Sequence, residues 1–80
     1  MEKFYKSGKQ LIDKTGHTIP FENLTYGLAS TKLKLKASPF TEYILTGIAN
    51  INGNAVILIE SKNENLLVSV QDFNLRFKLI

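Results

Sequence analysis

The chain has 80 residues, no cysteine and a formal net charge of +3. This length allows one domain, and the absence of cysteine excludes disulfide bonds, a thiolate nucleophile and a cysteine-ligated zinc ion. The hydrophobic fraction of 44% and the charged fraction of 21% are those of an ordinary folded protein. We therefore expect a single small domain over residues 1–80.

The positive charge is concentrated in the first half of the chain. Residues 1–36 hold seven lysines and three acidic residues, whereas residues 37–80 hold three basic and four acidic residues. Such an asymmetry can indicate an anionic partner. No run approaches the roughly 18 apolar residues of a membrane span, and the first residues lack the apolar stretch of a signal peptide. We expect a cytoplasmic protein if residue 1 is the native start.

Residues 9–21 predict a β-hairpin. Asp13 and Gly16 are the first and fourth residues of a segment with the preferences of a type I turn, and Gly16 can adopt the positive φ that closes such a hairpin. Pro20 has no N–H group to donate to a neighbouring strand. The second arm of the hairpin should therefore end at Pro20 or lie at a sheet edge.

The segment after the hairpin has a different pattern. Phe21, Leu24 and Leu28 follow one another with the spacing of one helix face. The segment is too short for a helix that is stable by itself. This spacing predicts one short helical turn over residues 21–27, or else a compact loop, that holds Phe21 and Leu24 against the core.

Residues 31–37, TKLKLKA, alternate strictly between polar and apolar side chains. The alternation predicts a half-buried strand with Lys32, Lys34 and Lys36 on its exposed face. Lysine is common on edge strands because its charge discourages edge-to-edge pairing between molecules. We therefore expect this strand to lie at a sheet edge.

Residues 43–80 carry the strongest signal, four short apolar runs separated by polar turn residues, which is the pattern of a β-meander. The dipeptide Asn52-Gly53 is typical of a tight hairpin turn. The run over residues 55–59 is apolar at every position and predicts a central strand that is buried on both faces. The last run alternates to its end and predicts an amphipathic strand over residues 73–80.

Gly47 interrupts the first run of the meander and predicts a β-bulge, a bend or a close crossing of two sheets. Strict alternation would place four apolar side chains of this run on one face: Tyr43, Leu45, Ala49 and Ile51.

Together these elements predict an all-β fold, either a small antiparallel barrel or a two-sheet sandwich built on the C-terminal meander. The predicted core consists of Leu33, Leu35, Leu45, Ile48, Val56, Leu58, Val68, Val70, Phe73, Leu75 and Phe77.

The sequence offers no constellation of catalytic or metal-binding residues. His17 is the single histidine and lies in the predicted turn, which excludes a two-histidine metal site. The five glycines are scattered and form no phosphate-binding loop. We expect a non-enzymatic protein without a metal, a cofactor or a small-molecule substrate.

An amphipathic terminal strand indicates how the domain would bind a partner. The main chain of an edge strand can pair with a strand of another protein, or with a second copy of the chain in a homodimer. The expected function is a protein-interaction module, an adaptor or inhibitor of a host or partner protein. The short chain, rich in lysine and asparagine, would suit an accessory protein of a phage or mobile element. We expect the partner-strand edge at Phe73, Leu75, Arg76, Phe77, Lys78 and Leu79.

The alternative function is that of a single-stranded nucleic-acid-binding β-barrel. Such barrels combine a basic groove with exposed aromatic side chains on which bases stack. Lys32, Lys34 and Lys36 would contact phosphates, and Tyr5 and Tyr26 would provide the stacking platforms. The RNP-type aromatic motif of RNA-recognition domains is absent.

The stretch LTGIANINGNAVILIESKNENLLVSVQDF resembles the small β-domains of inner-membrane proteins of secretion and pilus assembly. A Leu-x-Gly strand, a hairpin and a Val-Gly-Asp segment recur in those domains. The resemblance covers about a third of the chain, and Gln71 stands where the family has the glycine. It implies, as a further alternative, the β-domain of a secretion or pilus-assembly component, and we interpret it as a shared meander pattern.

Overall fold

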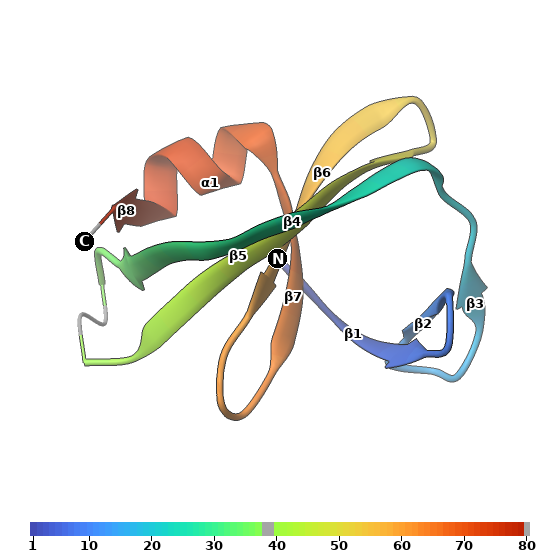
Figure 1. Cartoon of the computed structure of the whole chain (residues 1–80), viewed down its shortest axis with the longest axis horizontal. Coiled ribbons are helices and arrows are strands. Elements are labelled where there is room, and N and C mark those ends of the chain that lie inside the picture. Colours follow the sequence, from blue (N-terminus) through green and yellow to red (C-terminus); the bar gives the residue numbers. More distant parts are fainter. Residues whose placement is uncertain (38–39, 80) are drawn as a thin grey trace.

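The computed structural model describes residues 1–37 and 40–79, without the side chains of residues 26–30 and 79. The described residues form eight strands and one short helix (Figure 1). In chain order these are β1 (Glu2–Ser7), β2 (Gln10–Asp13), β3 (Thr18–Ile19), β4 (Glu22–Leu35), β5 (Glu42–Ile51), β6 (Asn54–Glu60), β7 (Asn65–Ser69), α1 (Val70–Arg76) and β8 (Phe77–Leu79). The predicted all-β fold is confirmed, with one helix added to it.

A single antiparallel sheet contains all the described strands, in the order β3-β2-β1-β7-β6-β5-β4-β8. Sequential neighbours β4, β5, β6 and β7 form a meander, which begins earlier in the chain than expected. The two strands at the ends of this order, β3 and β8, do not pair with each other. The sheet is therefore not closed into a barrel, and it does not divide into the two sheets of a sandwich.

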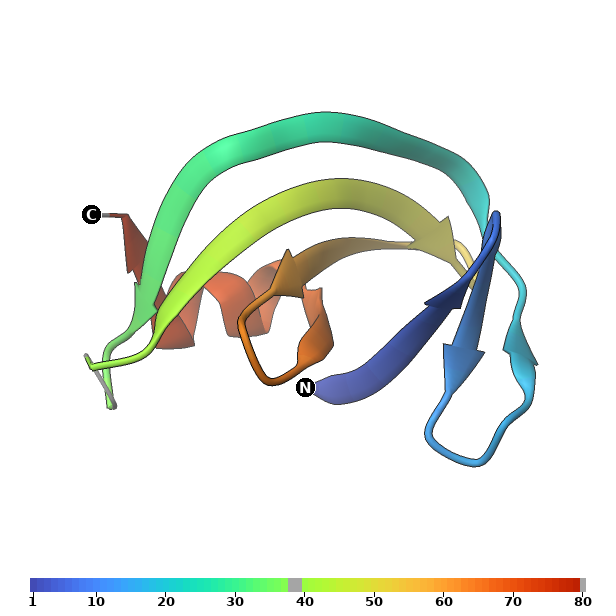
Figure 2. The same cartoon turned by 60° about the horizontal axis from the view of Figure 1, so that its bottom comes forward.

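The link between β3 and β4 forces the open sheet to curl. Pro20 and Phe21 alone connect these strands, although β3 stands at one end of the strand order and β4 near the other. So short a link spans about 10 Å of extended chain, so the two ends of the sheet come close together. Figure 2 shows the resulting arch, in which β4 follows the outer curve.

Both predicted turns are present. Between β2 and β3 the N–H of Gly16 donates to the carbonyl of Asp13 at 3.1 Å, and Gly16 has a φ of +92°. β3 ends directly before Pro20, as predicted. Asn52 and Gly53 have φ values of 53° and 78°, the left-handed pair that a type I′ hairpin turn requires.

A β-bulge at Thr46 makes β5 change faces. Leu45 pairs with Ile59 of β6, and the next pair along the ladder is Gly47 with Leu58. Thr46 is therefore an extra residue, and its hydroxyl donates to the carbonyl of Leu58 at 3.2 Å. An extra residue shifts the alternation of side chains by one position. Of the alternatives predicted at Gly47, the structure has the bulge, with Thr46 as the extra residue directly before the glycine.

The bulge overturns the predicted faces of β5. Tyr43 and Leu45, which precede it, join one hydrophobic cluster. Ala49 and Ile51, which follow it, join another. The prediction that these four side chains share a face is therefore wrong, because it assumed an uninterrupted alternation.

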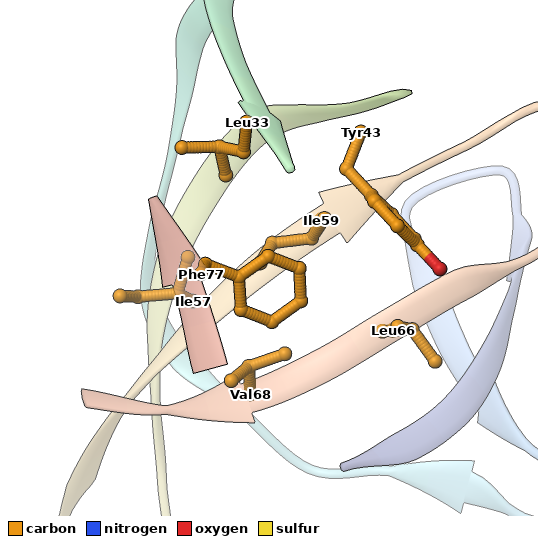
Figure 3. Packing of buried hydrophobic residues seen from close by; sticks show 7 residues of the cluster. All are labelled: Leu33, Tyr43, Ile57, Ile59, Leu66, Val68 and Phe77. Carbon is orange, nitrogen blue, oxygen red and sulfur yellow. The ribbon is translucent and has the colours of Figure 1, made fainter. Parts of the chain in front are cut away.

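The two clusters lie on opposite faces of the central strands β6 and β7. The helix-side core packs against α1 and β8 and has the buried members Leu33, Tyr43, Ile57, Ile59, Leu66, Val68 and Phe77 (Figure 3). The hairpin-side core packs against β1 and β2 and has the buried members Phe4, Leu11, Ala49, Leu58 and Leu67. The prediction of a central strand buried on both faces is thus confirmed for β6.

The structure has neither the predicted helical turn nor a compact loop over residues 21–27, because β4 begins at Glu22, directly after Phe21; both Phe21 and Leu24 do pack against the hairpin-side core. Glu22 pairs with Asn50 of β5. Pairing with this long neighbour outweighs a weak local preference. Asn23 has a left-handed φ of 53°, the register shifts after Glu22, and Leu24 packs against the hairpin-side core.

The predicted strand over residues 73–80 is wrong in its first part, where the chain forms α1. The Ser69 hydroxyl accepts a hydrogen bond from the N–H of Asp72 at 3.1 Å and caps the first turn of this helix. Phe73 and Phe77 are four residues apart, a spacing that fits the period of a strand and that of a helix equally. The alternation that includes Leu75 favoured the strand, whereas the helix leaves Leu75 64% exposed.

The core prediction is confirmed in part. Four predicted residues are buried: Leu33, Leu58, Val68 and Phe77. Four more are partly buried against the clusters: Leu35, Leu45, Val56 and Phe73. Three are instead exposed, Ile48 at 38%, Val70 at 44% and Leu75 at 64%. Ile48 follows the bulge and the other two lie in α1, so each error has one of these two causes.

Candidate interaction surface

Lys32 and Lys34 of β4 lie on the face opposite Leu33, as predicted, and Lys36 follows the end of β4; Lys32 and Lys36 are exposed and Lys34 is half-buried. Leu33, which lies between them, is fully buried in the helix-side core, whereas the side chain of Lys32 is 61% exposed. Lys32 Nζ lies 3.6 Å from Glu42 Oε1 of β5. Lys36 Nζ donates to the carbonyl of Asn74 in α1 at 3.4 Å. Two of the three lysines are thus partly engaged by neighbouring elements.

Lys34 stands directly opposite a second lysine. β8 pairs with β4 and places Lys78 across from Lys34, while Glu42 faces Lys34 from β5. Directly opposed residues of an antiparallel pair have side chains on the same face, about 5 Å apart at Cβ. Lys34 and Lys78 form no ion pair with any described residue. The patch, which we call the lysine face, comprises Lys32, Lys34, Lys36, Lys78 and Glu42.

β4 is not an edge strand where these lysines lie, contrary to the prediction for residues 31–37. β8 pairs with Leu33–Leu35 and makes the centre of this segment interior to the sheet. Protection of a free edge therefore does not account for Lys34. Sequence reasoning missed this because β8 was expected to be a longer strand without an assigned neighbour.

The first part of β4 does have a free backbone edge. Glu22–Thr31 has β5 on one side, and no strand within the described residues pairs with its other side. Figure 2 shows β4 along the top of the arch with β5 beneath it. We call the side of Glu22–Thr31 that faces away from β5 the open edge. Sequence reasoning missed it because these residues were assigned in part to a helical turn.

The open edge lacks the residues that commonly protect an edge. Residues 22–31 contain no lysine, arginine or proline. The ladder to β5 shifts register after Glu22 and again after Tyr26, and such shifts bend a strand. A strand added to this edge would therefore pair in stretches that the bulges separate.

The residues predicted as the partner-strand edge are divided between two elements. Three lie in α1, where they cannot form a strand edge: Phe73, Leu75 and Arg76. The other three form β8, at one end of the strand order. Phe77 is buried in the helix-side core, Lys78 is exposed, and the side chain of Leu79 lies outside the described part of the chain.

The structure does not bring Tyr5 to the lysine face. Tyr5 is 58% exposed on β1, and the strands β7, β6 and β5 separate β1 from β4. The backbone of Tyr26 lies in β4 opposite Gly47, and its side chain is outside the described part.

A groove of about 450 Å³ lies where the start of β1, the end of β2 and the turn after β5 meet. Asp13 and Asp72 stand among its lining, together with apolar side chains of β5, β6 and β7. Hydrogen bonds from the side chain of Thr15 and the backbone of His17 hold the pKa of Asp13 below its ordinary value. His17 is exposed in the turn, as predicted. The described residues include no group of three or more acidic or histidine side chains that could hold a metal ion.

The phenol of Tyr43 is the second group with a perturbed pKa. Its hydroxyl donates to Glu64 Oε1 at 3.3 Å. Burial of the ring, followed by the charge of Glu64, raises the pKa of Tyr43 above its ordinary value. Because Tyr43 belongs to the helix-side core, this shift reflects packing rather than a reactive site.

Comparison with known proteins assigns no family, since no family model, curated protein or solved structure matches the chain. Among the described residues, no helix is both long and apolar enough to cross a membrane.

Proposed function

We propose that this domain is a protein-interaction module that binds an extended segment of a partner protein by strand addition at the open edge. The observation that carries the proposal is the backbone of Glu22–Thr31, which has no paired strand on one side and no lysine, arginine or proline. A free edge presents N–H and C=O groups to another strand, so main-chain hydrogen bonds can supply the affinity. An adaptor or an inhibitor would use such a site in the same way.

The open edge is better suited to this role than the two ends of the strand order. β3 has two residues and β8 has three, whereas an ordinary strand has about five. β4 has 14 residues, and four residues of the open edge already pair with β5: Glu22, Thr25, Tyr26 and Thr31. A backbone that is ordered before binding loses less conformational entropy when the partner binds.

A selection of peptides tests this proposal. Displayed random peptides of about ten residues, the upper range of ordinary strand length, are selected on the immobilised chain. Bound peptides should slow amide hydrogen exchange within residues 22–31. They should also lose affinity when N-methylated at alternate positions, because every second residue of an added strand bonds to the edge. Protection of amides elsewhere, tolerance of N-methylation at every position, or a library without binders would contradict the proposal.

A second copy of the chain is one source of the added strand. Two open edges could pair about a two-fold axis and form a homodimer. Light scattering after size-exclusion chromatography measures the mass directly. A dimer whose formation protects the amides of residues 22–31 would identify the chain itself as the partner, and a monomer at every concentration would exclude it.

The lysine face favours a second candidate function, the binding of single-stranded nucleic acid. Lys34 and Lys78 stand opposite each other without an ion-pair partner among the described residues, an arrangement that would suit a phosphate. The distance of Tyr5 along the sheet removes one of the two expected stacking platforms, so strand addition is better supported. A mixed oligonucleotide that shifts the elution peak at low salt alone would support this candidate, and an unchanged peak at low salt would argue against it.

A further inference from the structure

The lysine face adjoins the open edge and indicates the chemistry of the segment that binds there. Lys32 directly follows Thr31, where the open edge ends. β8 occupies the same side of β4 from Leu33 onward, so a strand added along the open edge would end beside β8. The end of that strand would therefore lie near Lys32, Lys34 and Lys78.

Lys32, Lys34 and Lys78 lie within electrostatic reach of one another. Lys34 lies two residues beyond Lys32, which is about 7 Å along a strand. Lys78 stands across from Lys34, at about 5 Å between Cβ atoms. Both spacings are shorter than the Debye length of about 8 Å at physiological ionic strength. A charge at the end of the added strand would thus interact with several lysines at once.

The lysine face carries positive charge that its own residues do not neutralise. Its four lysines are accompanied by one carboxylate, and Glu42 is already paired with Lys32. Lys34 and Lys78 are like charges in directly opposed positions, an arrangement that destabilises a pair of strands. An anionic group at this point would reduce that repulsion, so the free domain is arranged for a ligand of opposite charge.

We propose that the segment bound at the open edge carries aspartate or glutamate at the end that lies beside β8, where its carboxylates meet the lysine face. This inference rests on the proposed strand addition and adds to it the chemistry of the partner. A protein segment is favoured over a nucleic acid because the adjoining recognition element is a backbone edge, which pairs with another peptide backbone.

Three synthetic peptides with one strand-forming body of alternating valine and threonine test the inference. Their ends carry glutamate, lysine or glutamine, and their dissociation constants are measured at about 50 mM and about 300 mM salt. The glutamate peptide should bind roughly tenfold more tightly than the glutamine peptide at low salt, through several exposed charge pairs. The lysine peptide should bind most weakly, and high salt should narrow the differences.

The double variant Lys34→Glu, Lys78→Glu should invert the preference, so that the lysine peptide binds most tightly. It keeps like charges in opposed positions of the β4–β8 pair, and it also places a carboxylate opposite Glu42 of β5. The matched control is Lys9→Glu, Lys62→Glu, which changes the net charge equally at two exposed lysines in turns outside the lysine face. This control should keep the original preference. Should the reversal variant fail to fold, Lys34→Gln, Lys78→Gln should abolish the preference without inverting it.

The outcomes separate this inference from the proposed function. Equal binding of all three peptides, with slowed exchange at residues 22–31, would overturn the acidic preference and leave strand addition intact. Binding of none of them, together with no binder from the random library, would overturn both. A single-stranded oligonucleotide that binds while the glutamate peptide does not, and that loses affinity in the reversal variant, would assign the lysine face to nucleic acid instead.

Discussion

The rings of Phe73 and Phe77 stack with their centroids 5.8 Å apart and an interplanar angle of 16°. Phe73 lies in α1 and Phe77 begins β8, so this contact joins the helix to the terminal strand. Phe77 also meets the ring of Tyr43 edge-on, at 5.5 Å between centroids. These contacts anchor β8, and with it Lys78, to the helix-side core.

Replacement of Phe77 by alanine should therefore be severely destabilising. The side chain is 4% exposed, and its removal should lower the free energy of unfolding by about 3 kcal/mol. A domain of this length has a total of roughly 4–12 kcal/mol. The control Leu75→Ala removes a side chain that is 64% exposed and should cost no more than about 0.5 kcal/mol. Urea unfolding measures both, and equal losses would show that Phe77 does not anchor β8.

The spacing of Phe73 and Phe77 also explains why the sequence did not predict α1. Positions 73 and 77 satisfy the period of a strand and that of a helix, so alternation alone favoured the wrong structure. The cap formed by Ser69 and Asp72 decides for the helix. Serine before an amphipathic segment is a recognised start signal, and greater weight on Ser69 would have found α1.

The residue types of the turns were sufficient to predict the turns, but they do not specify the register between paired strands. Gly16 and Asn52-Gly53 need particular φ values, and the residue types state that need directly. Thr46 has no such mark, because an extra residue in a ladder exists only relative to the partner strand. Gly47 indicated an irregularity, but its effect on the alternation was not included, and the bulge reversed the expected faces of half of β5.

Prediction of the lysine face and the open edge required the register between strands even more than prediction of the β5 faces did. Alternation correctly placed Lys32 and Lys34 on the face opposite Leu33, although Lys34 is half-buried and the strand ends before Lys36. The opposed position of Lys78 and the free edge before Lys32 arise from pairing between segments far apart in the sequence. No pattern within either segment specifies that pairing.

The bulge at Thr46 provides a second prediction. Its hydroxyl donates to the carbonyl of Leu58 at 3.2 Å in a partly buried position, and Thr46→Val removes that donor while keeping a branched side chain. The free energy of unfolding should fall by about 1 kcal/mol, the usual contribution of such a bond. Thr25→Val, at an exposed position of β4, should change it by less than about 0.5 kcal/mol. Denaturant titration of both variants in the same buffer measures these changes. A Thr46→Val variant as stable as the parent would mean that the Thr46 hydroxyl does not contribute to stability.

The third prediction concerns acid stability and Asp13. Its Oδ1 accepts hydrogen bonds from Thr15 Oγ1 at 2.6 Å, Thr15 N at 2.9 Å and His17 N at 3.0 Å, which lower its pKa in the folded state. A folded-state pKa below the unfolded value of 3.8 stabilises the fold above that pH, and the stabilisation is lost as the pH falls through the folded-state pKa. Asp13→Asn keeps an acceptor oxygen and does not titrate. Its unfolding free energy should therefore decline less than that of the parent between about pH 5 and about pH 2, and parallel declines would exclude Asp13 as the responsible group.

Removal of the repulsion between Lys34 and Lys78 should stabilise the domain and weaken its binding of an acidic segment. Lys78→Glu places a carboxylate directly opposite Lys34 and replaces a repulsion by an attraction on the same face of the β4–β8 pair. The free energy of unfolding should rise by about 0.5 kcal/mol at low salt, in the range of cross-strand charge pairs, and the gain should shrink as salt screens the pair. Lys62→Glu makes the same change of net charge outside the lysine face and should not reproduce the gain. The stabilised variant should bind the glutamate-ended peptide more weakly than the parent does. If Lys78→Glu proves no more stable than Lys62→Glu, the opposed lysines do not repel each other measurably and the electrostatic basis for an acidic partner is lost.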